Sequence, residues 1–260
     1  MIKGGYHLAR VKPTIDVLGN VAYDAGDVLF DWYKFEIPRG SCALKTLNVI
    51  HPGTNGAART GTDIELIFAT SVDGIAPPSL GDPDDAITTI AATACKNHII
   101  GHKYLDADVM ENSDEFGSYN IWTNTAGTST SHYEINTVLE GDPTYAGTTS
   151  GYQTIWIAAI AVGTNDFGTD VALNQAGHQA ISTTPVDLIV TGTDADDVFA
   201  VGDELISFVA ADGSSPKLIG TVTSIPDADS IVVDAVAEAF NHTTEICFRR
   251  PLTFNLGFEY

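Results

Sequence analysis

Basic residues are scarce in this sequence of 260 residues, which has 12 Lys and Arg against 34 Asp and Glu and a formal net charge of −22. A nucleic-acid-binding protein needs a basic face, and docking on an anionic membrane needs basic patches. The two adjacent basic residues Arg249-Arg250 are the only basic cluster. The composition therefore argues against nucleic acid and membranes as partners.

Cysteine is also scarce, with Cys42, Cys95 and Cys247 as the only three. Their number is odd, and no two of them have the spacing of metal ligands or of a redox pair. We expect three buried thiols in a protein made in a reducing compartment.

Long apolar runs are missing. The longest, residues 155–162, is far too short to cross a bilayer. No apolar run follows Lys3, so we expect no secretory signal peptide and synthesis in a cytoplasm.

Sequence signatures of catalysis are missing as well. There is no Gly-x-Ser-x-Gly elbow, no glycine-rich loop followed by Lys-Ser/Thr, and no dinucleotide fingerprint. We predict a protein that is not an enzyme. We assign no catalytic, cofactor-binding or metal-binding residues, and no cofactor.

Threonine and other β-branched or aromatic residues are abundant, and they favour strands. The sequence contains 29 threonines. Alternating or continuously apolar segments predict strands at residues 28–37, 42–50, 62–70, 154–162 and 252–260. The last of these places one set of side chains on a single face: Leu252, Phe254, Leu256, Phe258 and Tyr260.

Residues 186–248 have the pattern of a complete small barrel. Short turn segments separate β-branched runs, as in strands that pair with their neighbours in sequence. The expected strands are 201–209, 217–225 and 230–234, with turns at 211–213 and 227–229.

These patterns predict an all-β fold. The closing strand can face a core only if a sheet is already present to receive it. We therefore expect a jelly-roll-like β-sandwich body at residues 27–185 plus 249–260, an inserted barrel at 186–248, and an extended N-terminal arm at 1–26.

The stretch 71–150 is the least regular. A short helix could start at Asp82 with Pro83 in its first turn, although Thr88, Thr89 and Thr93 favour a strand. The Thr/Ser/Gly-rich residues 123–131 predict a surface loop.

Two kinds of residue cluster could hold a metal. His98 and His102 have the spacing of a zinc pair on a helix, but Gly101 and two isoleucines favour strand or turn, and no glutamate lies between them. Acidic groups could hold Ca²⁺, but none has the full ligand pattern, so we favour solvated turns. These groups are Asp82-Pro83-Asp84-Asp85, Asp106-Ala107-Asp108 and Asp194-Ala195-Asp196-Asp197.

Two further sets of side chains are candidates for carbohydrate chemistry. Paired carboxylates hydrolyse glycosides only at a suitable separation, and the carboxylates on predicted strands are Asp31, Glu36, Asp63 and Glu65. Aromatic rings that could stack on sugars, or equally pack at an interface, are Tyr119, Trp122, Tyr133 and Tyr145.

One stretch of the C-terminal part resembles virion structural proteins of tailed phages, especially those that infect aquatic cyanobacteria and other marine bacteria. The resemblance covers roughly the last 110 residues. It lies in strands and turns: residues 157–161, 165–168, 171–177, 201–204 and 219–225.

The resemblance implies a capsid decoration or cement protein. Such proteins sit on the outer surface of the virion as homotrimers and brace the joints between subunits of the major capsid protein. The expected partners are therefore the major capsid protein and further copies of this chain. Two alternatives stay open: a carbohydrate-binding β-sandwich module, or a tail or connector component of the virion. An unrecognised hydrolase is a third, more distant hypothesis.

Overall fold

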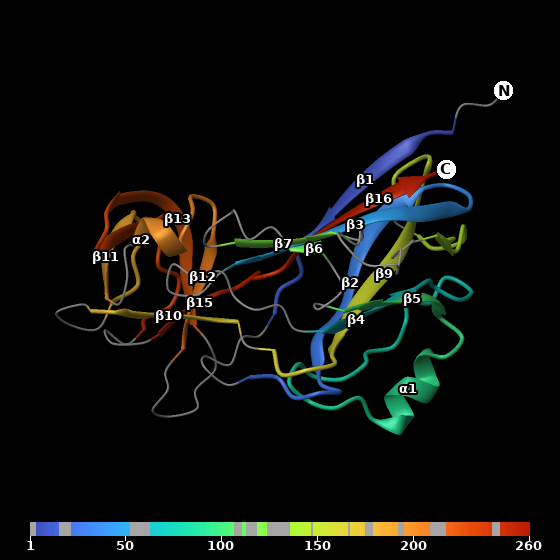
Figure 1. Ribbon diagram of the computed structural model, residues 1–260, viewed down its shortest axis with the longest axis horizontal. Coiled ribbons are helices and arrows are strands. Elements are labelled where there is room, and N and C mark those ends of the chain that lie inside the picture. Colours follow the sequence, from blue (N-terminus) through green and yellow to red (C-terminus); the bar gives the residue numbers. More distant parts are fainter. Residues whose placement is uncertain are drawn as a thin grey trace.

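The computed structural model is a two-layer β-sandwich joined to a closed barrel (Figure 1). It describes residues 4–15, 22–52, 63–106, 111–112, 119–123, 136–146, 148–165, 167–174, 179–191, 195–208, 217–240 and 245–260. The predicted all-β class, with a sandwich body and a barrel, is confirmed. The turn expected at 211–213 and all but the first residue of the loop expected at 123–131 lie outside the described residues.

The first layer of the sandwich is a six-stranded sheet with the order β1-β16-β3-β7-β6, in which β8 also pairs with β3. Its strands are β1 (Tyr6–Val11), β16 (Thr253–Glu259), β3 (Cys42–Pro52), β7 (Tyr119–Thr123), β6 (Glu111–Asn112) and β8 (Thr137–Leu139).

The second layer is a four-stranded sheet with the order β2-β9-β4-β5. Its strands are β2 (Val28–Pro38), β9 (Tyr152–Ala161), β4 (Ile64–Ala69) and β5 (Ile99–Leu105). The continuous apolar run predicted as a buried strand is β9, which pairs with β2 on one side and β4 on the other. A strand with neighbours on both sides and a core on one face suits such a run.

The two layers pack through one core, to which the closing strand contributes heavily. Leu252, Phe254, Leu256 and Phe258 are all buried in it, as their alternation predicts. Tyr260 shares their parity but lies half-exposed at the end of the chain. β16 lies between β1 and β3, so the C-terminal strand completes the first sheet.

The barrel has the strand order β10-β11-β14-β13-β12-β15 and its own core. Its strands are β10 (Gly168–Leu173), β11 (Val186–Thr191), β12 (Glu204–Phe208), β13 (Lys217–Asp227), β14 (Ser230–Val233) and β15 (Glu245–Phe248). The two predicted pairings of sequence neighbours are present, as β12 with β13 and β13 with β14. The short helix α2 (Ala195–Val198) precedes β12.

Two boundaries differ from those expected. The barrel begins at β10 rather than at residue 186, because β10 pairs with both β11 and β15 and so closes the ring. The expected N-terminal arm contains a strand, β1, which pairs with β16 through six residues. In both segments the deciding partner is distant in sequence, so local patterns do not reveal it.

The predicted helix also lies elsewhere. The helix α1 (Thr89–Cys95) begins after the N-cap Thr88, whose Oγ1 accepts a hydrogen bond from the Ala91 amide at 3.1 Å. Residues 82–85 form a turn in which Asp84 has a φ of 68°, a left-handed conformation that a helix cannot include. Threonine, which suggested a strand here, instead caps the helix.

Candidate functional site

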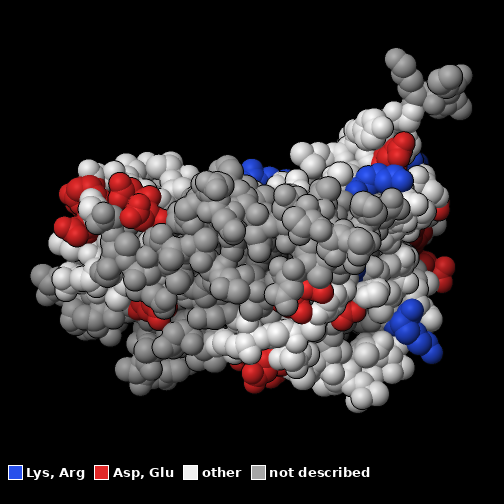
Figure 2. All heavy atoms as spheres, in the orientation of Figure 1, with Lys and Arg blue, Asp and Glu red and all other residues white. Residues whose placement is uncertain are grey.

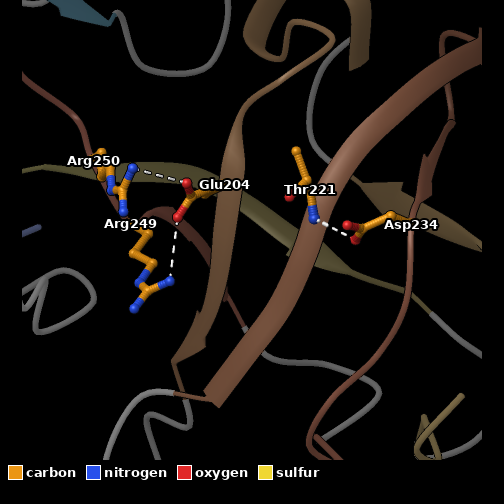
Figure 3. A network of polar contacts seen from close by, with 5 residues as sticks. All are labelled: Glu204, Thr221, Asp234, Arg249 and Arg250. Carbon is orange, nitrogen blue, oxygen red and sulfur yellow. Dashed lines mark hydrogen bonds and ion pairs between the residues drawn. The ribbon is translucent and has the colours of Figure 1, made fainter. Parts of the chain in front are cut away.

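The junction between barrel and sandwich carries a network of charged side chains next to a hollow of about 330 Å³ (Figure 3). Glu204 is the first residue of β12, and Arg249 and Arg250 follow β15 on the segment that leads into β16. The network therefore lies where the chain leaves the barrel and re-enters the sandwich.

Both arginines converge on the same carboxylate. Arg249 Nη1 lies 3.2 Å from Glu204 Oε2, and Arg250 Nη1 lies 3.0 Å from Glu204 Oε1. The backbone adds two bonds, since the Arg249 amide donates to the Glu204 carbonyl at 2.8 Å and the Arg249 carbonyl accepts from the Ile15 amide at 3.1 Å. Arg249 thus connects β12 of the barrel to the segment after β1 of the sandwich.

The other wall of the hollow is built by Thr221 and Asp234. The Asp234 carboxylate accepts hydrogen bonds from the amides of Thr221 and Ala235, each at 2.8 Å. The Thr221 bond, with a further contribution from Ala235, lowers the pKa of Asp234 below its usual value despite the opposing effect of burial.

Chemically, this arrangement is suited to holding the connection in place. Two guanidinium groups and two carboxylates balance in charge, and each acidic group is already hydrogen-bonded. The Arg250 guanidinium is positioned through Nη1, which contacts Glu204. Its Nε is buried and has no acceptor among the described residues. Sequence reasoning marked Arg249-Arg250 only as a basic pair and missed Glu204 and Asp234 as their neighbours.

The proposed zinc pair is not assembled on a helix. His98 precedes β5, and its Nδ1 lies 2.9 Å from the Thr70 carbonyl. His102 lies within β5, with its Nε2 3.3 Å from Glu65 Oε1. Within the described ranges, no group of three His, Cys, Asp or Glu side chains is placed to hold a metal ion.

Two of the three acidic groups have described members in a turn or on the helix α2. Asp82 and Asp85 belong to the turn before α1, and Asp196 and Asp197 to the first turn of α2. Burial, followed by the charges of Asp27, Asp85 and Asp24, raises the pKa of Asp84. Asp106 directly follows β5, whereas Asp108 and Asp194 lie outside the described residues.

The candidate carboxylates for glycoside hydrolysis have separate local roles. Asp31 accepts from the Leu80 amide at 3.0 Å, and Asp63 from the Tyr104 hydroxyl at 2.5 Å. Glu36 accepts from the amide and hydroxyl of Thr149 at 2.8 and 2.6 Å, and these bonds lower its pKa. The structure does not bring these groups into one site.

Of the aromatic candidates, Tyr145 packs against buried Trp156 with ring centroids 4.9 Å apart. Its ring therefore belongs to the packing of the body. Tyr133 and the side chains of Tyr119 and Trp122 lie outside what the structure describes.

The three cysteines are free and buried, as predicted. Burial raises the pKa of Cys42 and of Cys95, which keeps both as thiols at neutral pH. No helix in the described part of the chain is long and apolar enough to cross a membrane.

Comparison with known proteins identifies no family for this chain. No protein-family model matches the sequence, and no curated protein matches it. Among solved structures, the chain aligns with one from Sulfolobus turreted icosahedral virus at 10% identity and a TM-score of 0.15, covering 99% of this chain and 91% of that one. It also aligns with one from the VP2 subviral particle of infectious bursal disease virus at 10% identity and a TM-score of 0.16, covering 98% and 41%. Both of these solved structures come from viruses, but TM-scores this low carry no argument for fold or function.

Proposed function

We propose that this protein is a non-enzymatic structural component of a phage virion. In this role it decorates the outer capsid surface and stabilises the shell by bridging subunits of the major capsid protein. The proposal keeps the function that the sequence resemblance implies, including assembly on the shell as a homotrimer. The observation that carries it is the packing of barrel residues into the core of the sandwich.

A bridging protein has to hold two contact surfaces at a fixed separation. Domains joined by polar contacts alone are expected to move relative to one another. In this chain the barrel residues Ile206 and Cys247 are buried in the core of the sandwich, with Leu218 packed against it. The Glu204–Arg249–Arg250 network reinforces the same junction.

The excess of acidic over basic residues is greatest in the barrel segment. Residues 168–248, which form the barrel, contain thirteen Asp and Glu but a single Lys. On the face shown in Figure 2, red acidic side chains gather over the barrel, whereas the rest of the molecule carries both red acidic and blue basic ones. Such a surface favours a basic partner, since complementary charge steers association. We expect the barrel to contact a basic region of the shell.

Cryo-electron microscopy of the virion tests the proposal directly. The expected result is density for the sandwich and barrel on the outer shell, in symmetric copies over the joints between major capsid subunits. Recovery of the protein only from the soluble fraction of infected cells, with none in purified particles, would contradict it. Density confined to the tail would support the tail or connector alternative instead.

Particles that lack the protein allow the role of the junction to be tested. Adding back the unaltered protein should raise the temperature at which the particles release their genome. The double variant Arg249→Ala/Arg250→Ala removes the ion pairs at the junction. It should still bind the particles but raise their genome-release temperature less. Equal protection by both proteins would show that the fixed mounting of the barrel plays no part.

A further inference from the structure

Strand β1 is an edge strand of the six-stranded sheet, where a further strand can be added (Figure 1). Among the described residues it pairs with β16 on one side only. Its outward side chains are Tyr6, which is 80% exposed, Leu8, which is 66% exposed, and Arg10. Large exposed apolar side chains on an edge strand are typical of a protein–protein contact.

The hydrogen bonds between β1 and β16 determine which backbone groups are directed outwards. Gly5 and Tyr260 exchange both of their backbone bonds, at 2.8 and 3.1 Å. Bonding alternates along an antiparallel pair, so the N–H and C=O groups of Tyr6, Leu8 and Arg10 point away from β16. The same three residues therefore offer their backbone groups to an incoming strand in the plane of the sheet, while their side chains stand on its exposed face.

Edge strands are commonly protected against pairing with another chain by bulges, prolines or lysines, and β1 has none of these within Tyr6–Val11. Its register with β16 is unbroken. The edge strands β2 and β5 of the other sheet both pair with their neighbours through register shifts. Among these three edge strands, β1 is the one suited to regular pairing with a strand of another chain.

We propose that β1 pairs antiparallel with β1 of a second copy of this chain about a two-fold axis at Leu8, making one continuous sheet across two sandwiches. Leu8 then lies opposite the Leu8 of the other copy, and Tyr6 opposite its Arg10. The bonding alternation favours this register, because it brings the outward backbone groups of all three residues into pairs.

The side chains of β1 are self-complementary in this arrangement. The two-fold arrangement places each Arg10 guanidinium beside a Tyr6 ring, a favourable cation–π contact, and makes an aliphatic pair of the two Leu8 side chains. The first 15 residues contain Lys3, Arg10 and Lys12 but no acidic residue, in a chain with a net charge of −22. Two copies therefore meet through a segment that is free of acid–acid repulsion.

This two-fold contact joins copies in pairs, so it is separate from the contacts that would hold the proposed homotrimer together, and it does not depend on the virion assignment. Disulfide trapping tests its register. Opposed residues of a bonded pair have Cα atoms about 5.5 Å apart, within the range of a disulfide. Leu8→Cys should therefore form a two-chain species under mild oxidation. The native cysteines are all buried, so the background is low.

Tyr6→Cys is the matched control, because Tyr6 is also largely exposed on the same strand. In the proposed register the two thiols that this variant introduces are four residues out of step, about 13 Å apart, and should not cross-link. The double variant Tyr6→Cys/Arg10→Cys should cross-link again. Trapping of Tyr6→Cys as fast as Leu8→Cys, or no trapping of either Leu8→Cys or the double variant, would overturn the proposal.

Sedimentation of the chain in solution supplies a measurement without oxidation. Leu8→Lys places two like charges opposite each other and should weaken dimerisation about tenfold or more. Val138→Lys adds the same charge at an aliphatic residue on β8 that is 58% exposed, and should leave the dimer unchanged. A chain that stays monomeric at every concentration, or equal effects of the two variants, would contradict the contact.

Discussion

At the scale of single residues, Gly220 shows why a barrel strand contains a residue without a side chain. Its φ is +146°, and a Cβ at this position would lie 2.6 Å from the Ala235 carbonyl oxygen and 2.8 Å from Asp234 Oδ1. The strand passes so close to Asp234 and Ala235 that only glycine fits. The bond from the Thr221 amide to Asp234 depends on this close approach.

We therefore expect Gly220→Ala to lower the free energy of unfolding by about 1–3 kcal/mol, through backbone strain and the clash with Ala235. Chemical denaturation measures the loss. Gly163→Ala is the control, since a Cβ there meets nothing within 4 Å. Similar losses in both variants would show that the contact at Gly220 has no special cost.

Asp142 holds two loops together through its carboxylate. It accepts from the Gly74 amide at 2.8 Å, from the amide and hydroxyl of Thr144 at 2.8 and 2.6 Å, and from the Ser71 hydroxyl at 3.1 Å. The Thr144 hydroxyl bond has the largest effect, and together these bonds lower the pKa of Asp142 to about 2.

The sign of the pH dependence follows from this lowered pKa. The stabilisation is fully present above the usual pKa of an aspartate, and it is lost as the pH falls from about 4 towards 2. Because the carboxylate is close to solvent, we expect Asp142→Asn to cost about 1 kcal/mol at pH 7 and almost nothing at pH 2. Thermal melts of both proteins between pH 2 and pH 7 measure this difference in stability.

Asp84→Asn provides a contrast, because burial raises the pKa of Asp84 and its charged form is disfavoured. Asparagine also tolerates the left-handed backbone of this residue, whose φ is 68°. At pH 7 this variant should be as stable as the original chain or slightly more so. A loss equal to that of Asp142→Asn would contradict the opposite pKa directions.

At the scale of secondary-structure elements, β16 takes part in the junction of the two layers in two ways. It pairs with β1 and β3 and places Phe254 in the core, with its ring centroid 5.8 Å from that of Phe30 on β2. The strand thus joins the first sheet by hydrogen bonds and the second by packing.

Phe254→Ala should lower the free energy of unfolding by about 3–5 kcal/mol, because it leaves a cavity between the layers. Asn255→Ala, at the adjacent and half-buried residue of the same strand, should change it by no more than about 0.5 kcal/mol. Denaturant titration compares the two variants. Losses of similar size would mean that β16 acts mainly through its backbone.

Strand positions were predictable at this scale because periodicity and turn residues are local. Residues 28–37, 42–50 and 154–162 correspond closely to β2, β3 and β9. Pairing was less predictable. β3 and β4 follow each other in sequence but belong to opposite sheets, and β10 belongs to the barrel rather than to the body. Hydrophobic alternation marks which face is buried but not which strand lies alongside.

At the scale of the whole molecule, the large negative charge opposes compact folding. The net charge is −22, and the segment 168–248 holds thirteen of the acidic residues with one lysine. Repulsion between exposed charges weakens as salt shortens the screening length from about 30 Å at 0.01 M to about 8 Å at 0.15 M.

We therefore expect the melting temperature to rise by about 2–4 °C between 0.01 M and 0.15 M NaCl, equivalent to about 1 kcal/mol for a chain of this size. Scanning calorimetry at constant pH measures the shift. An unchanged or lower melting temperature would show that ion pairs such as Glu204–Arg250 outweigh the repulsion.

Composition and neighbouring residues suffice to predict the all-β class, the buried faces of the main strands, the burial of the three thiols and the acidity of the barrel segment. Two other features depend on the tertiary structure: β1 lies at the edge of the sheet with Leu8 outwards, and Glu204 meets Arg249, 45 residues later in the chain. Contacts of this kind arise from packing of the whole chain, which no local pattern records.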